Sequence, residues 1–463
     1  MNRLPILALL LFFISCSSAP DTTTSLYDGP EVADSFQDPG AKILQAEVSR
    51  LPFKHIEWEF KFNDVEIRRM TKAGDHLYIE TNNNQLIAVD RFIGEVKWIY
   101  HVDSNRPLDF PPVVAQGVPE AIRVLEEELL RINRAIDDTV RLKGPGEEVK
   151  KLQKERAEKR EKLKVSRFGD NVYFLSQQEM YCLDRISGTL RWTRRMEFVP
   201  SAQPTATQFY IFVSAANKAR VYVLNVKQRG SVAEYFRADI NSRHNQITAR
   251  PVFEDPVLYF VSHDGKVYFY SVSDRDGVSP LKTQGPIRAN PVLFKTTEKS
   301  GAKGEFREKK ILFVGSSDNA FYAVDGASGQ LDWKYECGAP IFDPAVAVGN
   351  TVYVKSEGGA LFAFDIFPVH RRPDGSVMGA KRNGSLRWKL PLGERFLMKG
   401  EDYVYVLGPD QEIYAIKEMS GHIVGRYPTK RLHMFVTNTS DDLFYCANSS
   451  GYIYALRESS ERY

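Results

Sequence analysis

An eleven-residue motif that recurs along the chain is the sequence feature that most constrains its fold. The motif reads Ala-x-Asp-x-x-x-Gly-x-x-x-Trp at 88–98 and 323–333, and Cys replaces its Ala at 182–192. A fourth copy begins at 363–367 and resumes at 384–388 after an insertion. Glycine tolerates a positive φ, and Asp accepts hydrogen bonds from nearby backbone N–H groups. Each copy therefore predicts two strands joined by a tight turn, with Trp in the second strand.

Weaker copies of the same unit lie between the strong ones. The residue before the small apolar position marks each unit, and the markers are Ile87, Tyr181, Tyr222, Tyr268, Tyr322, Phe362, Tyr414 and Tyr454. Four of the seven steps between these markers are 40 to 46 residues long, and the other three contain visible insertions. A period of about 40 residues with several short strands per unit is typical of a propeller blade. The sequence therefore predicts an all-β, eight-bladed β-propeller.

The two ends of the chain complete this prediction. The last repeat stops without its Gly-to-Trp strand, whereas Trp58 lies in an early strand with no repeat before it. An N-terminal strand that completes the last blade would close the ring and remove exposed sheet edges. The predicted structural repeat tryptophans are Trp58, Trp98, Trp192, Trp333 and Trp388. Each supplies an apolar face and one N–H donor that can bind a neighbouring blade, so packing is preferred to ligand binding.

The motif resembles the tryptophan-docking repeat of the PQQ-type β-propellers over about residues 53–457. That family includes quinoprotein alcohol dehydrogenases and the BamB-like lipoproteins of outer-membrane β-barrel assembly. The resemblance implies the propeller fold and leaves two functions to compare, an enzyme and a scaffold.

The chain begins with features of a secreted lipoprotein. One Arg precedes an apolar run at 6–14 that is too short to span a bilayer, so residues 1–15 are predicted to be a signal peptide. The sequence FISC is similar to a bacterial lipobox and predicts lipid attachment at Cys16; ordinary cleavage nearby is the alternative. Neither residue after Cys16 is Asp, which by analogy with enterobacterial sorting favours the periplasmic side of the outer membrane. Residues 16–50 are small and polar and predict a flexible tether before a propeller at 51–463.

Composition limits the remaining classes of function. Hydrophobic residues make up 43% of the chain, and the net charge is only +3 with both signs well mixed, so no nucleic-acid partner is expected. Cys182, Cys337 and Cys446 are isolated in β-type runs and predict buried small hydrophobes. A disulfide between two of them stays open, because sequence does not pair them.

One segment, 119–164, departs from the β pattern. Apolar residues recur every three or four positions in its first half, KGPG at 143–146 forms a turn, and its second half is rich in Lys and Arg. This pattern predicts an inserted antiparallel α-helical hairpin of coiled-coil type at the start of the second blade. The hairpin either packs only on itself or presents its basic helix to a partner protein or to anionic lipid headgroups. Basic loops expected at 295–310 and 367–383 are further candidates for partner contact.

The residues favour a scaffold over an enzyme. A quinoprotein of this fold needs, by resemblance, adjacent cysteines, calcium ligands and an Asp base. This chain has no adjacent cysteines, its prominent Asp residues occupy one repeat position, and its eight His show no metal-ligand spacing. We therefore expect no catalytic, cofactor-binding or metal-binding residues.

The expected function is that of a periplasmic, outer-membrane-anchored scaffold in β-barrel protein assembly. Its expected partner is the barrel-inserting outer-membrane subunit, and its partner-binding residues are not assigned by the sequence. A PQQ-dependent dehydrogenase-like enzyme and a cell-wall or polysaccharide-binding propeller are the alternatives.

Overall fold

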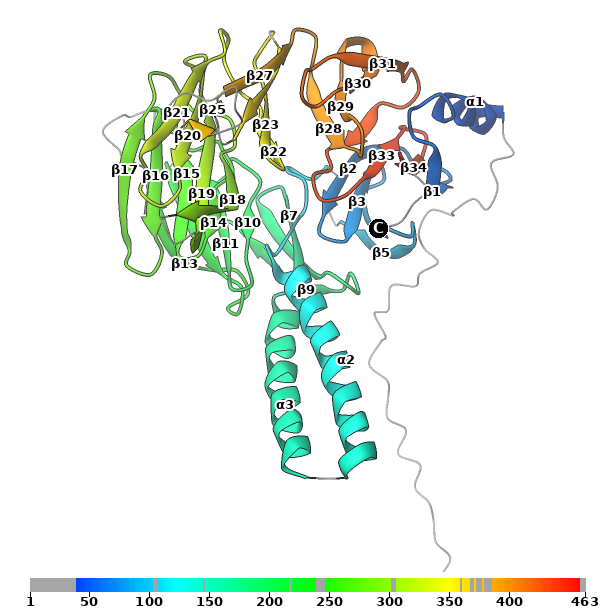
Figure 1. Ribbon diagram of the computed structural model, residues 1–463, viewed down its shortest axis with the longest axis vertical. Helices are drawn as coiled ribbons and strands as arrows, with labels where there is room; N and C mark the ends of the chain where they lie inside the picture. The colour runs from blue at the N-terminus through cyan, green and yellow to red at the C-terminus, as the bar shows by residue number, and fades with distance from the viewer. Residues whose placement is uncertain are drawn as a thin grey trace, which may run out of the picture.

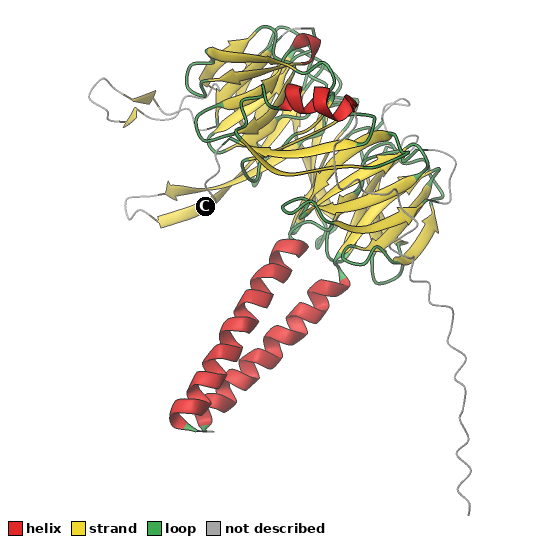
Figure 2. Ribbon diagram, turned by 90° about the vertical axis from the view of Figure 1, so that its right-hand side faces the viewer, coloured by secondary structure: helices red, strands yellow, loops and turns green. Residues whose placement is uncertain are grey.

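The computed structural model describes residues 39–458, except 103–106, 145, 216–218, 239–245, 301–304, 359, 367–369, 372–376 and 379–384. The predicted signal peptide, Cys16 and the predicted tether up to residue 38 lie outside these residues. Eight four-stranded antiparallel sheets form an eight-bladed β-propeller with an inserted helical hairpin, so the predicted fold class is confirmed (Figures 1 and 2).

Blades 1 to 4 follow one another along the chain. Blade 1 contains β2 (Ile67–Ala73), β3 (His76–Thr81), β4 (Gln85–Asp90) and β5 (Val96–His101). Blade 2 contains β6 (Val113–Val114), β7 (Asn171–Ser176), β8 (Glu179–Asp184) and β9 (Leu190–Arg195). Blade 3 contains β10 (Thr205–Ala206), β11 (Tyr210–Ala215), β12 (Arg220–Asn225) and β13 (Ser231–Arg237). Blade 4 contains β14 (Val252–Glu254), β15 (Val257–Val261), β16 (Lys266–Ser271) and β17 (Asp276–Lys282).

Blades 5 to 8 complete the ring. Blade 5 contains β18 (Val292–Ser300), β19 (Glu305–Gly315), β20 (Ala320–Asp325) and β21 (Leu331–Glu336). Blade 6 contains β22 (Val346–Val348), β23 (Thr351–Lys355), β24 (Leu361–Asp365) and β27 (Ser385–Leu390); β25 (His370–Arg371) and β26 (Val377–Met378) pair separately. Blade 7 contains β28 (Arg395–Lys399), β29 (Val404–Leu407), the 3-10 helix η1 (Pro409–Gln411), β30 (Glu412–Ile416) and β31 (Ile423–Pro428). Blade 8 contains β32 (Met434–Val436), β33 (Leu443–Ala447), β34 (Tyr452–Arg457) and the N-terminal β1 (His55–Lys61).

The ring is closed by β1, as predicted. This strand pairs antiparallel with β34, from His55 opposite Arg457 to Lys61 opposite Tyr452. Arg457 Nε also donates to Glu57 Oε1 at 2.8 Å. Blade 8 thus consists of three C-terminal strands and one N-terminal strand, and the last repeat receives the outer strand that it lacks.

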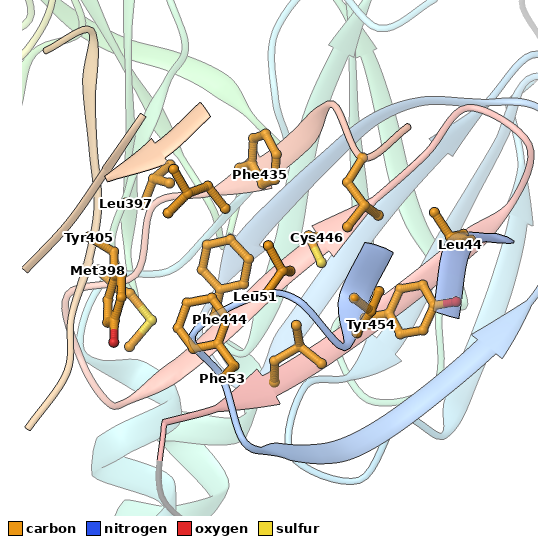
Figure 3. Packing of buried hydrophobic residues seen from close by; sticks show 14 of the residues in the cluster. Leu44, Leu51, Phe53, Leu397, Met398, Tyr405, Phe435, Phe444, Cys446 and Tyr454 are labelled. Carbon is orange, nitrogen blue, oxygen red and sulfur yellow. The ribbon is translucent and has the colours of Figure 1, made fainter. Parts of the chain in front are cut away.

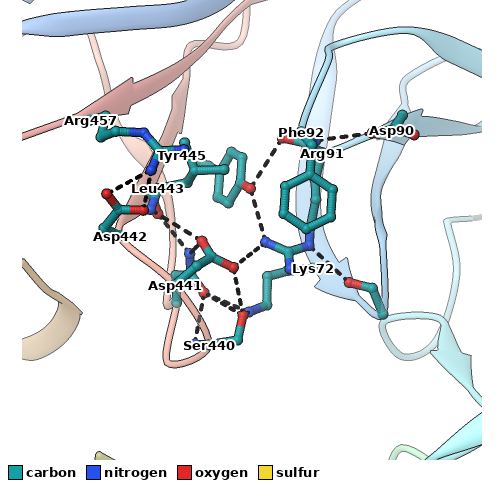
Figure 4. A network of polar contacts seen from close by, with 12 residues as sticks. Lys72, Asp90, Arg91, Phe92, Ser440, Asp441, Asp442, Leu443, Tyr445 and Arg457 are labelled. Atoms are coloured by element: carbon teal, nitrogen blue, oxygen red, sulfur yellow. Dashed lines mark hydrogen bonds and ion pairs between the residues drawn. The ribbon is translucent and has the colours of Figure 1, made fainter. Parts of the chain in front are cut away.

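A polar network joins blade 8 to blade 1 at this closure (Figure 4). The Arg91 guanidinium forms an ion pair with Asp441 and donates to Tyr445 Oη at 3.2 Å, while Lys72 Nζ donates to Ser440 Oγ at 2.7 Å. Burial opposes ionisation of Asp441, but the charge of Arg91 and hydrogen bonds from its neighbours outweigh it and lower the pKa of this carboxyl. The buried charges are therefore paired across the joint between the two ends of the chain.

Tryptophans connect successive blades through a repeated contact. The indole N–H of Trp58 donates to Arg91 O at 3.0 Å, and that of Trp98 donates to Arg185 O at 2.8 Å; Trp388 contacts Glu418 O in the same way. Each acceptor lies in the turn that follows the third strand of the next blade. At Gly94, with φ of +72°, a Cβ atom would approach the Trp58 ring to 2.7 Å. The motif therefore needs Gly both for its backbone conformation and for the close approach of Trp.

For the two remaining repeat tryptophans, the structure gives no such hydrogen bond among the residues that it describes. Trp192 lies against Gly230 of blade 3 and is partly exposed. Trp333 is 3% exposed and packs on Phe313, Phe321 and Phe364, but its Nε1 has no hydrogen-bond partner among the described residues. The turn that it faces in blade 6 follows β24, where the chain inserts residues before β27.

A helix before β1 corrects the predicted extent of the tether. Residues Pro39–Val48 form α1, which buries Ala41, Leu44 and Val48 against blades 7 and 8 (Figure 3). Glu47 accepts the backbone N–H groups of Arg431 and Leu432 at 3.0 and 3.2 Å. The expectation of a flexible tether to residue 50 is therefore wrong for this part, since Leu44 and Val48 lie one turn apart and cover an apolar surface of the ring.

The helical arm comprises α2 (Val118–Lys143) and α3 (Glu147–Phe168), inserted between β6 and β7. It projects away from one face of the propeller (Figures 1 and 2). The basic segment expected as a loop at 295–310 instead extends β18 and β19, in register from Val292–Phe313 to Ser300–Glu305. This segment is rich in Lys and Glu and does not alternate apolar with polar residues, so the sequence does not predict strands there. The strands form because their backbones pair. Most of the other expected loop, 367–383, lies outside the described residues.

Cys182, Cys337 and Cys446 are unpaired and buried in three separate clusters, around β8, β21 and β33. Among the described helices, none is both long and apolar enough to cross a membrane.

The contribution of the Trp98 hydrogen bond to stability can be measured by comparison with Trp333. Both Trp98→Phe and Trp333→Phe remove the same ring atoms from a buried site, but only the first removes a hydrogen bond and leaves the Arg185 carbonyl without its donor. We expect Trp98→Phe to lower the free energy of unfolding by about 1–3 kcal/mol more than Trp333→Phe. Urea denaturation followed by circular dichroism tests this, and equal losses would contradict it.

Candidate partner-binding surface at the base of the helical arm

The first helix of the arm starts from a fixed point on the propeller. Gln116 N donates to Ala206 O of blade 3 at 2.8 Å, and Gly117 adopts φ of +72° to turn the chain into α2. Pro119 stands in the first turn, where a missing N–H costs nothing. Val118 and Ile122 are buried there with Leu163 of α3. The base of α2 is thus packed and hydrogen-bonded rather than hinged.

The second helix is fastened at its C-terminus by Arg191 of β9. Its Nη1 donates to Phe168 O at 2.6 Å, while Nη2 forms an ion pair with Asp184 at 2.5 Å. Asn171 Nδ2 also donates to Phe168 O at 3.2 Å. A cation at the last carbonyls of a helix satisfies unpaired acceptors and interacts favourably with the helix dipole. The repeat residue Asp184 therefore also helps to hold the arm.

A buried network continues from this point into the joint between blades 1 and 2. Arg185 forms a two-pronged ion pair with Asp170, with N···O distances of 2.5 and 3.1 Å, and its Nη1 lies 3.1 Å from His76 Nδ1. Burial, followed by the charge of Arg185, lowers the pKa of His76 to about 4. The neutral imidazole can accept a hydrogen bond from Arg185, whereas an imidazolium would place a second positive charge beside the guanidinium.

The two helices of the arm pack on each other along a divided seam. One cluster near the base contains Ile122, Leu129 and Leu163, and a second cluster near the tip contains Ile136 and Val149. Between them, Lys159 Nζ forms an ion pair with Glu128 at 2.6 Å; nearer the base, Arg167 pairs with Glu126 at 2.8 Å. The two helices therefore bury their apolar seam against each other, and both expectations for this segment, self-packing and partner contact, stay open.

A hollow of about 600 Å³ lies where α3 meets β9 and the turn after β12. We call it the base groove, and it is lined by Glu161, Lys164, Val165, Arg167, Phe168, Arg191 and Lys227. Val165 and Phe168 are 40% and 46% exposed. Lys227 Nζ lies 5.2 Å from the centre of the Phe209 ring, which is itself partly exposed. Exposed apolar side chains flanked by cations in a concave surface are typical of a binding site for another molecule.

The Asp residues of the repeat, which are the prominent carboxylates of the sequence, form hydrogen bonds and ion pairs within the propeller. The carboxylates of Asp90, Asp184 and Asp325 accept backbone N–H groups of their own turns, and the shortest of these bonds are 3.0, 2.9 and 2.7 Å long. Asp365 instead pairs with Arg387. Within the described parts of the chain, no three His, Cys, Asp or Glu side chains are grouped so that they could hold a metal ion.

Sequence reasoning missed Arg91 in the closure joint between blades 8 and 1, and Arg185 and Arg191 at the base of the arm. Arg91 and Arg185 follow the repeat Asp in two copies of the motif, and this shared position was the available signal. The base groove had no such signal, because Phe168, Arg191 and Lys227 come from three separate elements. Cys16, the predicted lipid attachment residue, lies outside the described residues.

Comparisons with known proteins agree with this geometry. The family model described as outer membrane protein assembly factor BamB matches residues 54–233 and 291–367, more than half of the chain. The chain belongs to this family. A crystal structure of BamB from Moraxella catarrhalis is similar, with a TM-score of 0.54 and 12% identity over 88% of this chain and 99% of that one.

A computationally designed protein, Ika8, gives a TM-score of 0.51 at 10% identity over 85% of this chain and 97% of its own. At such identities the two structures show the shared propeller fold alone. A search of curated proteins finds no match.

The neutral state of His76 predicts a pH dependence of stability. The pKa of this side chain is about 4 in the folded state, against 6.5 for an unperturbed His, so between these values the unfolded chain binds a proton that the folded chain does not. Stability should therefore fall as the pH falls from about 6.5 to about 4. This group alone should contribute on the order of 2–3 kcal/mol to the fall.

The variant His76→Gln keeps an acceptor for Arg185 and removes the titration. We expect its unfolding free energy to depend less on pH than that of the wild type over this range, and the exposed-site variant His422→Gln serves as the matched control. Denaturant titrations at several pH values compare the three proteins. Parallel curves for the wild type and His76→Gln would contradict the assignment.

Proposed function

We propose that this protein is a scaffold of outer-membrane β-barrel assembly that works on the periplasmic side of the outer membrane. Membership of the family whose model carries that description is the observation on which the proposal rests. A closed propeller with rigid blades suits this role, because its turns and its arm are held in fixed positions around one body. The partner that we propose is the barrel-inserting outer-membrane subunit.

The base groove and the arm are the surfaces that we assign to partner contact. The groove combines exposed Val165 and Phe168 with cations, and the arm is anchored by Arg191 and by the ion pair of Arg185 with Asp170. A rigid anchor transmits a contact on the arm to the propeller without a loss of order at the junction. Among the described residues, no three His, Cys, Asp or Glu side chains are grouped so that they could hold a metal ion.

Purification from native membranes tests the assembly role. The tagged full chain should recover the barrel-inserting subunit after mild solubilisation. A variant in which residues 132–156 are replaced by a Gly-Ser turn keeps the base cluster and serves as a matched control for the arm tip. Recovery of that subunit with neither protein would contradict the proposal, and quinone absorbance with calcium-dependent turnover, or retention on cell wall, would favour the two alternatives.

Attachment through Cys16 forms the second part of the proposal. The variant Cys16→Ser should no longer incorporate labelled fatty acid and should move from the outer-membrane fraction to the soluble periplasmic fraction, because one thioether-linked lipid anchor is lost. Cys337→Ser, in the propeller, is the matched control and should keep both properties. Unchanged fractionation of Cys16→Ser would refute lipid anchoring at this residue.

A further inference from the structure

The two helices of the arm differ in charge, and most of the cations of α3 form no ion pair with a described residue. α3 carries nine Lys or Arg and five Glu, whereas α2 carries five Lys or Arg and six Asp or Glu. Only Lys150, Lys159 and Arg167 of α3 form ion pairs with described residues. The other six cations, Lys151, Lys154, Arg156, Arg160, Lys162 and Lys164, form none with any residue that the structure describes.

The excess charge leads along α3 into the base groove. Lys150, Lys154, Lys164 and Phe168 are spaced by 4, 10 and 4 residues, which places them on one face of the helix. They extend over about 27 Å at 1.5 Å per residue. Lys154 and Lys164 are exposed, and Lys164 and Phe168 line the groove together with Lys227. Three lysines thus outnumber the one carboxylate on this face, Glu161, and the face ends in a concave site with two exposed apolar side chains.

We propose that this face of α3 and the base groove bind an acidic segment of a partner protein, with an apolar side chain of that segment seated against Val165 and Phe168. Charge complementarity identifies the occupant, because unpaired cations attract carboxylates and the only strongly exposed apolar residues of α3 lie within the groove. A flat anionic membrane surface fits less well, since those apolar residues line a hollow. The inference goes beyond the assembly role and does not depend on it.

A peptide-binding experiment tests the chemistry of the site. The full chain in detergent is titrated with a fluorescent glutamate-rich peptide that has one central Phe. We expect Lys154→Glu combined with Lys164→Glu to weaken binding at least tenfold at low salt, and added salt to weaken binding to the wild type. Arg134→Glu combined with Arg141→Glu places the same charge change on α2 and should have little effect. Equal losses in the two double variants, or no binding by the wild type, would overturn the proposal.

The apolar contact is tested separately. Replacing the central Phe of the peptide by Ser should weaken binding to the wild type several-fold but should barely change binding to Phe168→Ser, which lacks the proposed contact. Equal losses for both proteins would refute seating in the groove. Circular dichroism checks that every variant keeps its helices. Vesicles containing phosphatidylglycerol are tested in parallel, and binding to them in place of the peptide would replace the proposal with a membrane contact.

A photo-crosslinking residue at position 168 identifies the native occupant in cells, with exposed position 130 on α2 as control. Crosslinked peptides rich in Asp and Glu, from position 168 alone, would support the inference. Neutral or basic peptides would overturn it. If the acidic peptides come from a protein unrelated to barrel assembly, the inference stands and the proposed function fails. A different outcome is that the barrel-inserting subunit is recovered equally by the Lys154 and Lys164 double variant and crosslinks at another position. In that case the proposed function stands and the inference about the groove fails.

Discussion

The pairing of β1 with β34 is the interaction on which the rest of the propeller depends. It joins two segments separated by almost the whole chain, and it supplies the outer strand of blade 8. It also brings Trp58 onto the turn of blade 1, where the indole reaches Arg91 O and Gly94. Because Arg91 in turn pairs with Asp441, strand pairing, aromatic docking and a buried ion pair all meet at this one joint. Loss of any one leaves a buried donor or charge without its partner.

The same turn position serves a second purpose one blade further on. Arg185 occupies the place of Arg91, but it binds Asp170 of its own blade and contacts His76 of blade 1. Trp98 docks on the Arg185 carbonyl, so the contact that aligns blades 1 and 2 also fixes the place where α3 ends. The arm therefore shares its anchor with the blade joint, and its orientation follows that of the ring.

The arm is an insertion that leaves the four-stranded sheet of blade 2 intact. It enters and leaves between β6 and β7, which in the other blades are joined by a short turn, and it closes its own apolar seam. What remains exposed is charge on α3 and the apolar pair at the base. Neither Val165 nor Phe168 belongs to the buried clusters of the arm, and this is why we assign both, with the charge on α3, to partner contact.

Much of the fold was determined by the sequence alone. The spacing of Asp, Gly and Trp predicted the blade, because Gly94 and Gly188 combine a positive φ with room for an indole ring. The missing strand of the last repeat predicted closure by the N-terminus, and the apolar spacing of 119–164 predicted the hairpin. The motif and the hairpin are local and can be found in a short window of residues, whereas closure follows from a comparison of the two ends of the chain.

Other features were decided only by the tertiary structure. The helix α1 forms because the ring offers an apolar surface to Leu44 and Val48, and its ten residues carry too little pattern to predict it alone. Trp333 matches its motif fully, yet its Nε1 has no hydrogen-bond partner among the described residues, since the acceptor must come from the next blade, where an insertion separates β24 from β27. The base groove gathers Phe168, Arg191 and Lys227 from three elements. A sequence specifies each of these side chains, but only the packing of blades and helices brings them within reach of one ligand.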